Sequence, residues 1–95
     1  MESPRIFATI MFVHTDNDSG VDKQDLLYDP AVSLKAYADF FLEQTKIKRG
    51  VQRAKLFSLE LSEHNEHGDY LLDENNQIKR RLIDLSESKL SQRNA

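Results

Sequence analysis

The residues of this chain best suited to bind a metal ion gather in one short segment, residues 63–69, with the sequence EHNEHGD. Two imidazoles, His64 and His67, stand three positions apart among carboxylates, and zinc accepts both kinds of ligand. The third histidine, His14, is distant in the sequence, and Asn, Gly and His also make up an ordinary exposed turn. We therefore expect a turn here, with no metal and no cofactor.

A second acidic segment, residues 16–20 (DNDSG), has the composition of a calcium-binding loop without its register. Counted from Asp16, the glycine stands at the fifth position instead of the sixth, and Leu27 stands at the twelfth, where a bidentate glutamate is required. The sequence therefore predicts a solvated turn and no calcium site.

Catalytic motifs are missing from the sequence. The chain has no cysteine and three glycines, and it contains neither a phosphate-cradling glycine loop nor a nucleophile elbow. His14, Thr15 and Asp16 follow an apolar run, at the place where small α/β sites often lie, but such a polar group is also what ends a strand. We expect that the protein is not an enzyme.

Basic residues form two clusters that suit an anionic partner. The eight cations are Lys46, Lys48, Arg49, Arg53 and Lys55 in the first cluster, and Lys79, Arg80 and Arg81 in the second. If folding brought them together, they would form a surface for nucleic acid. However, six acids and no Lys or Arg occupy residues 60–74, the formal net charge is −3, and no aromatic residue accompanies the cations in a stacking pattern. Nucleic-acid binding is therefore the alternative function.

The elements that would position these groups are organised around the apolar run at residues 6–13, IFATIMFV. In a strand, one face carries Ile6, Ala8, Ile10 and Phe12, and the other carries Phe7, Thr9, Met11 and Val13. Neither face is polar, so both require cover. We predict a central strand whose second face, Phe7, Thr9, Met11 and Val13, is a candidate interface.

One amphipathic helix is predicted over residues 30–48. Asp29 suits its cap, Pro30 its first turn, and Gly50 the left-handed position after its last turn. The helix face consists of Leu34, Tyr37, Ala38 and Phe41. Residues 14–29 are predicted to form a long loop, which folds its apolar residues back onto the domain: Val21, Leu26, Leu27 and Tyr28.

Beyond Gly50 the pattern favours strands. Val51, Phe57, Leu59 and Leu61 alternate as a strand would, although Ala54, Phe57 and Leu61 also fit a helix face. Residues 65–69 then form a hairpin loop that leads into a third strand at 70–72.

Two interpretations of the next segment stay open. In the favoured one, Asp73 caps a helix with Ile78, Leu82 and Leu85 on its inner face. In the other, residues 73–76 form a hairpin turn before a fourth strand at 78–85.

These elements predict one small α+β domain over residues 1–85, followed by a polar tail at 86–95. The favoured architecture is a β-α-β-β antiparallel sheet with a C-terminal helix, packed against one main helix. It resembles a ferredoxin-like domain without its last strand. The alternative is a β-α-β-β-β meander with a single helix.

The small size, the missing catalytic motifs and the two apolar faces of the central strand favour a non-enzymatic interaction or regulatory protein. It would dock on a protein partner or on itself as a homodimer. Residues 1–5 lack the cationic start of a secretory signal, and the apolar run after them is too short to span a bilayer. We therefore expect a cytoplasmic protein with no membrane partner.

Overall fold

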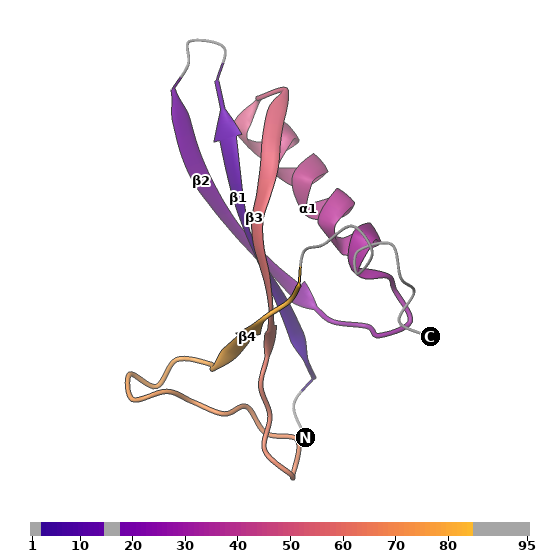
Figure 1. The fold of residues 1–95 in the computed structure, drawn as a ribbon, viewed down its shortest axis with the longest axis vertical. Coiled ribbons are helices and arrows are strands. Elements are labelled where there is room, and N and C mark those ends of the chain that lie inside the picture. Colours follow the sequence, from indigo (N-terminus) through magenta and orange to yellow (C-terminus); the bar gives the residue numbers. More distant parts are fainter. Residues whose placement is uncertain (1–2, 15–17, 85–95) are drawn as a thin grey trace.

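The computed structural model describes residues 3–14 and 18–84, and this part of the chain forms a small α+β domain (Figure 1). The elements are β1 (Arg5–Val13), β2 (Ser19–Leu27), α1 (Leu34–Arg49), β3 (Arg53–Ser62) and β4 (Arg80–Leu82). The four strands form one sheet in the order β2-β1-β3-β4, and every neighbouring pair is antiparallel. The predicted class, a small antiparallel sheet on one main helix, is therefore confirmed.

β1 lies inside the sheet because its β-branched and aromatic residues suit a strand that is paired along both edges. Its even-numbered side chains are buried against the helix layer: Ile6, Ala8, Ile10 and Phe12. The helix and β3 complete the core with Leu34, Tyr37, Ala38, Phe41 and Leu59. The predicted inner face of the central strand and the predicted helix stripe therefore meet.

α1 begins four residues later than the sequence pattern predicts. Its cap is Ser33, whose hydroxyl accepts a hydrogen bond from the N–H of Ala36 at 3.1 Å. Asp29 instead accepts the N–H of Ala31, because an aspartate can close a turn two residues on as readily as it caps a helix. At the other end Gly50 adopts a φ of 64° and donates its N–H to the carbonyl of Ile47, as predicted.

β2 occupies residues that the sequence pattern assigns to a loop. Its helix-facing positions include Asp22 and Gln24, so the alternation that marks a half-buried strand is missing. The Gln24 amide donates to the Phe41 carbonyl at 2.9 Å and to the Thr45 hydroxyl at 2.7 Å. A strand that hydrogen-bonds to a helix through its side chains does not need an apolar inner face.

The favoured C-terminal helix is wrong for the described residues 73–84, which form a turn and β4. The Asp73 carboxylate accepts the N–H groups of Asn75 and Gln77 at 2.8 and 2.9 Å, and Asn76 in the same turn has a φ of 60°. An aspartate such as Asp73 can close a turn as well as cap a helix. After this turn the chain pairs as β4 with the end of β3 and does not form a helix. Leu85 and the predicted polar tail lie outside the described residues.

A similar turn at residues 65–69 matches the predicted hairpin loop. The Asn65 side chain accepts the N–H groups of His67 and Asp69 at 2.8 and 3.0 Å. The predicted strand at 70–72 is reduced to single bridges, from Tyr70 to His64 and from Leu72 to Ile78. Residues 63–79, between β3 and β4, thus form a loop with two tight turns, which we call the 63–79 loop.

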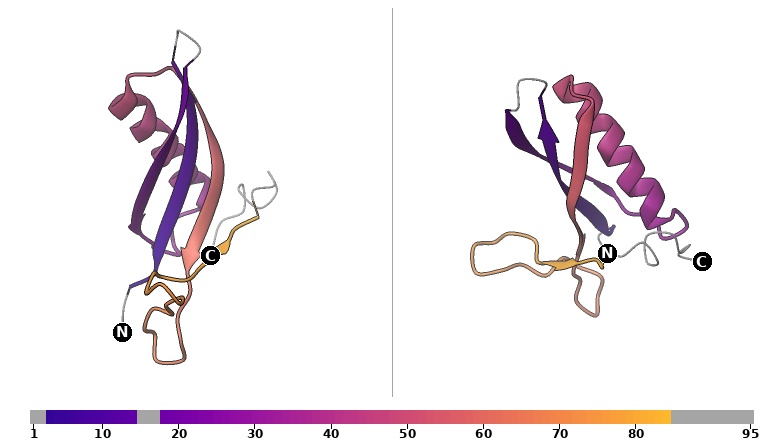
Figure 2. Two further views of the ribbon diagram at one scale, coloured as in Figure 1. Left: turned by 90° about the vertical axis from the view of Figure 1, so that its left-hand side faces the viewer. Right: turned by 45° about the horizontal axis from the view of Figure 1, so that its top comes forward.

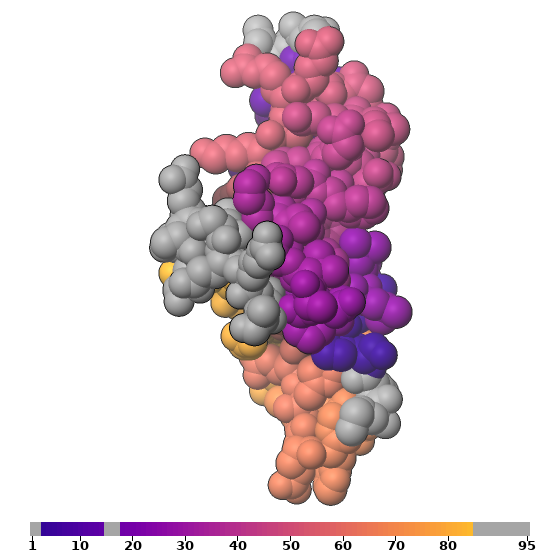
Figure 3. All heavy atoms as spheres, turned by 90° about the vertical axis from the view of Figure 1, so that its right-hand side faces the viewer, coloured from indigo at the N-terminus to yellow at the C-terminus, as the bar shows by residue number. Residues whose placement is uncertain are grey.

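The domain has two layers, one sheet and one helix, and its shortest extent is 20 Å. Figure 2 shows α1 on one side of the sheet. Figure 3 looks at the helix side, where α1 (magenta) forms the middle and upper surface and the 63–79 loop (orange) projects below it. Among the described residues, no helix lies on the other side of the sheet.

Phe12 and Gly20 stand directly opposite each other on β1 and β2, and a Cβ added at position 20 would lie 2.5 Å from Cζ of Phe12. The Phe12 ring has little room to move, because it is buried and the Arg49 guanidinium lies 5.2 Å from its centroid. We expect Gly20→Ala to lower the free energy of unfolding in urea by about 1–3 kcal/mol. Ser19→Ala, at the exposed neighbouring position, should change it by less than about 0.5 kcal/mol. Equal stability of the two variants would contradict this packing.

Candidate functional site

The sheet face that points away from α1 gathers side chains from all four strands, and we call it the open face. Directly paired residues share a face, so the strand register identifies most of its members. They are Arg5, Phe7, Thr9, Met11 and Val13 on β1, Ser19, Val21, Lys23, Asp25 and Leu27 on β2, Arg53, Lys55, Phe57, Ser58 and Glu60 on β3, and Arg80 and Leu82 on β4. All of them lie on strands, so the sheet ladder holds their backbone.

Phe57 joins the open face through a β-bulge. Thr9 pairs with Ser58 and Ile10 pairs with Leu56, so Phe57 is left without a partner on β1. Leu56 packs against the core on the helix side, and alternation therefore turns the next side chain, Phe57, to the open face. Phe57 is 64% exposed.

The open face exposes a large amount of apolar surface. Six apolar residues are at least one third exposed: Met11 44%, Val13 36%, Val21 53%, Leu27 59%, Phe57 64% and Leu82 71%. Met11 stands directly opposite Val21, so the apolar surface continues from β1 to β2. Beside it, Met11, Val13, Arg53, Ala54 and Lys55 line a shallow hollow.

Charges on the open face fall into paired and unpaired groups. Arg5 forms an ion pair with Asp25 at 2.5 Å. Arg80 lies 3.7 Å from Glu60 and places its guanidinium 3.9 Å from the centroid of the Phe7 ring. Within residues 3–14 and 18–84, no ion pair is formed by the three remaining cations, which we call the unpaired cations: Lys23, Arg53 and Lys55.

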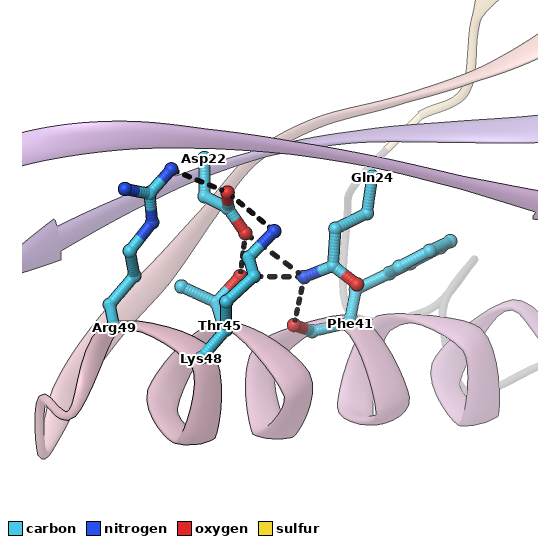
Figure 4. Close-up of polar contacts among 6 residues, drawn as sticks. All are labelled: Asp22, Gln24, Phe41, Thr45, Lys48 and Arg49. Carbon is cyan, nitrogen blue, oxygen red and sulfur yellow. Dashed lines mark hydrogen bonds and ion pairs between the residues drawn. The ribbon is translucent and has the colours of Figure 1, made fainter.

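Two of the cations predicted to bind an anion are engaged inside the domain. Asp22 of β2 is 2% exposed and faces the last turns of α1 (Figure 4). Its carboxylate accepts hydrogen bonds from Lys48 Nζ at 2.9 Å, Arg49 Nη2 at 3.0 Å and Thr45 Oγ1 at 2.8 Å. Lys48 and Arg49 therefore neutralise a buried carboxylate.

The environment of Asp22 keeps it ionised. Burial raises the pKa of its carboxyl, but hydrogen bonds from Lys48, Thr45 and Arg49 outweigh burial and lower the pKa from 3.8 to about 2. Asp22, Gln24 and Thr45 thus form a polar link between β2 and α1 that is complete at neutral pH.

The eight predicted cations do not share one surface. Arg53 begins β3, whereas Arg80 pairs with Ser62 at the other end of that strand, about 30 Å away at about 3.3 Å per residue. Arg53, Lys55 and Arg80 lie on the open face, Arg81 pairs with Leu61 on the helix side, and Lys46 lies in the last turn of α1. Lys79 precedes β4, where its N–H bonds to the Leu71 carbonyl.

The two neighbouring histidines do not converge on a metal site. Both ring nitrogens of His64 have partners, Ser62 Oγ at 2.8 Å and the Gly68 carbonyl at 3.0 Å. His67 is exposed and lies 3.5 Å from its neighbour Glu66. In the described ranges, no three His, Asp or Glu side chains group as metal ligands would.

The predicted interface residues Phe7, Thr9, Met11 and Val13 do lie together on the open face. The sequence interpretation misses the contribution of β2, namely Val21, Lys23 and Leu27, because it treats this segment as a loop. It also assigns Phe57 to the same strand face as Leu59 and Leu61, which the bulge makes wrong. The sequence carries no clear signal for β2, because Val21, Lys23, Asp25 and Leu27 on its open side mix apolar and charged types, and its helix-facing side includes Asp22 and Gln24.

Comparisons of the chain with protein-family models, with curated proteins and with solved structures find no match. Within the described residues, no helix has both the length and the apolar character needed to cross a membrane.

The polar link at Asp22 predicts a pH dependence. Its folded pKa of about 2 lies below the ordinary value of 3.8, so the carboxylate stabilises the fold above about pH 4, and this contribution is lost as the pH falls through about 2. Asp22→Asn should lower the free energy of unfolding at neutral pH by about 2 kcal/mol and flatten its decline in acid. Urea titrations at neutral and acidic pH measure both effects.

The matched control is Asp39→Asn, which removes an exposed ion pair with Lys35 on α1. It should cost less than about 0.5 kcal/mol and leave the acid dependence almost unchanged. The assignment fails if the Asp22 variant declines in acid as steeply as the unmodified protein.

Proposed function

We propose that this chain is a small, non-enzymatic interaction or regulatory protein that docks through its open face on another protein or on a second copy of itself. The observation that carries the proposal is the set of six exposed apolar residues on one side of a sheet whose other side is closed by α1: Met11, Val13, Val21, Leu27, Phe57 and Leu82. Contiguous exposed apolar surface rimmed by polar groups is typical of interaction sites.

The way in which this surface is held also supports docking. Its side chains stand on paired strands and not on loops, so little backbone freedom is lost when a partner binds. The polar link at Asp22 attaches the edge strand β2 to α1, and β2 supplies Val21 and Leu27 to the surface. Docking therefore needs no rearrangement of the fold.

Nucleic-acid binding is the second candidate, because the register brings an aromatic residue to the cations. Phe57 shares the open face with Lys55 and Arg53 of the same strand and with Lys23 across β1. Exposed aromatic rings beside cations are typical of surfaces that bind single-stranded nucleic acid. Of the eight cations predicted for this role, this surface uses Arg53, Lys55 and Arg80.

The docking proposal predicts a position-dependent cross-link. A photoreactive p-benzoylphenylalanine replaces Val21 on the open face or, as the control, Ala36 on the exposed side of α1, and the protein is irradiated in its native cells. We expect a cross-linked protein species from position 21 that disappears when Phe57→Ser is added, and none from position 36. Absence of a cross-link from position 21, or equal cross-linking from both positions, contradicts docking through the open face.

The nucleic-acid candidate predicts a salt-dependent complex with a single-stranded oligonucleotide. Three phosphate contacts, one for each unpaired cation, give a slope of about −2 for log K against log salt. Fluorescence anisotropy of labelled dT12 measures it, and Phe57→Ala should weaken binding by about 1–3 kcal/mol. No binding at low ionic strength removes this candidate.

A further inference from the structure

The open face differs in charge from the rest of the chain. It carries five cations, Arg5, Lys23, Arg53, Lys55 and Arg80, and two carboxylates, Asp25 and Glu60, for a formal charge of +3. The whole chain has a formal charge of −3, so the remainder of the sequence carries −6. The face that exposes apolar residues on all four strands therefore also carries net positive charge, in a protein whose overall formal charge is negative.

The positive charge that remains available is concentrated around one apolar strip. Both carboxylates are satisfied by arginines of the same face, which leaves Lys23, Arg53 and Lys55. Met11 of β1 stands opposite Lys55, and Thr9 stands opposite Lys23, so cations flank β1 on both sides. Two strand spacings separate these flanks, about 10 Å, which is the width of one extended segment or one helix.

Charge argues against a second copy as the occupant. Two open faces brought together would place six unpaired cations in one interface, and like charges across an interface are costly. The chain's own residues 85–95 do not match the positive charge of the open face either, because they contain two cations, Lys89 and Arg93, and one carboxylate, Glu87.

The floor of the strip argues against nucleic acid. It consists of Met11, Val13 and Val21, which are aliphatic, and the one other aromatic ring of the open face, Phe7, is covered by Arg80. Only Phe57 is left to stack on a base. Aliphatic side chains of a protein fit this floor better than base rings do.

We infer that the occupant of the open face is a linear segment of another protein that places apolar side chains on the Met11, Val13, Val21 and Phe57 strip and acidic side chains against Lys23, Arg53 and Lys55. The inference rests on the proposed docking function and commits it to an acidic partner in place of a homodimer.

Selection from a library of random 12-residue peptides tests this partner chemistry. Peptides enriched on the immobilised 95-residue chain should combine apolar residues with a net negative charge, and their binding should be lost with Phe57→Ser. Lys23→Gln, Arg53→Gln and Lys55→Gln together should weaken binding of the best peptide at least about tenfold and reduce the salt dependence of that binding. The matched control replaces Lys35, Lys46 and Arg81 by Gln, which changes the net charge equally outside the open face, and should leave affinity within about twofold.

The urea midpoints of both triple variants should stay close to that of the unmodified protein, because the substituted side chains lie on the surface. This measurement checks that both variants are folded. Neutral or basic peptides that still require Phe57 would overturn the acidic partner and leave docking intact. A dimer in sedimentation equilibrium that Phe57→Ser dissociates would assign the face to a second copy, and tighter binding of dT12 than of any selected peptide would assign it to nucleic acid. Lack of any enriched peptide also counts against the inference, whereas a missing cross-link from position 21 removes the docking function itself.

Discussion

The packing of α1 against one side of β1 is the interaction on which the rest of this structure depends. β1 is apolar on both faces, but the described part of the chain contains one helix, and that helix covers Ile6, Ala8, Ile10 and Phe12. Every second residue of the paired strands is thereby turned away from the core, because side chains alternate across a sheet. The open face is the direct consequence of two apolar strand faces and one covering helix.

The second consequence concerns the edge strand β2. An apolar inner face would have attached β2 to the helix layer by burial, but Asp22 and Gln24 do so by hydrogen bonds to Thr45, Arg49 and the Phe41 carbonyl. A charge that points inward is also a known means of keeping an edge strand from pairing with other chains. The same residues therefore hold β2 in place and disfavour pairing of its free edge with another strand.

The parts of the fold that the sequence predicts are those in which local pattern and tertiary packing agree. The strand at 6–13, the stripe of α1 and the Gly50 end are of this kind. β2 was missed because its inner side chains are polar, and Phe57 was placed on the wrong face because a bulge is set by pairing with β1 and leaves no local signal. The predicted helix after Asp73 was wrong because the same side chain caps helices and closes turns. Of the open face, Phe7, Thr9, Met11 and Val13 on β1 were predicted as an interface, and its cations on β3 and β4 were predicted without knowledge of the face that they share.

An uncovered, apolar and positively charged sheet face in the unbound protein is the central claim, and methyl NMR with a soluble gadolinium chelate tests it most directly. The account predicts strong broadening of the methyl signals of Met11, Val13 and Val21 in dilute protein, while those of Ile6 and Ile10 are spared. If the signals of Met11, Val13 and Val21 are protected as well as those of the two isoleucines, the open face is covered within the free chain and the account is contradicted.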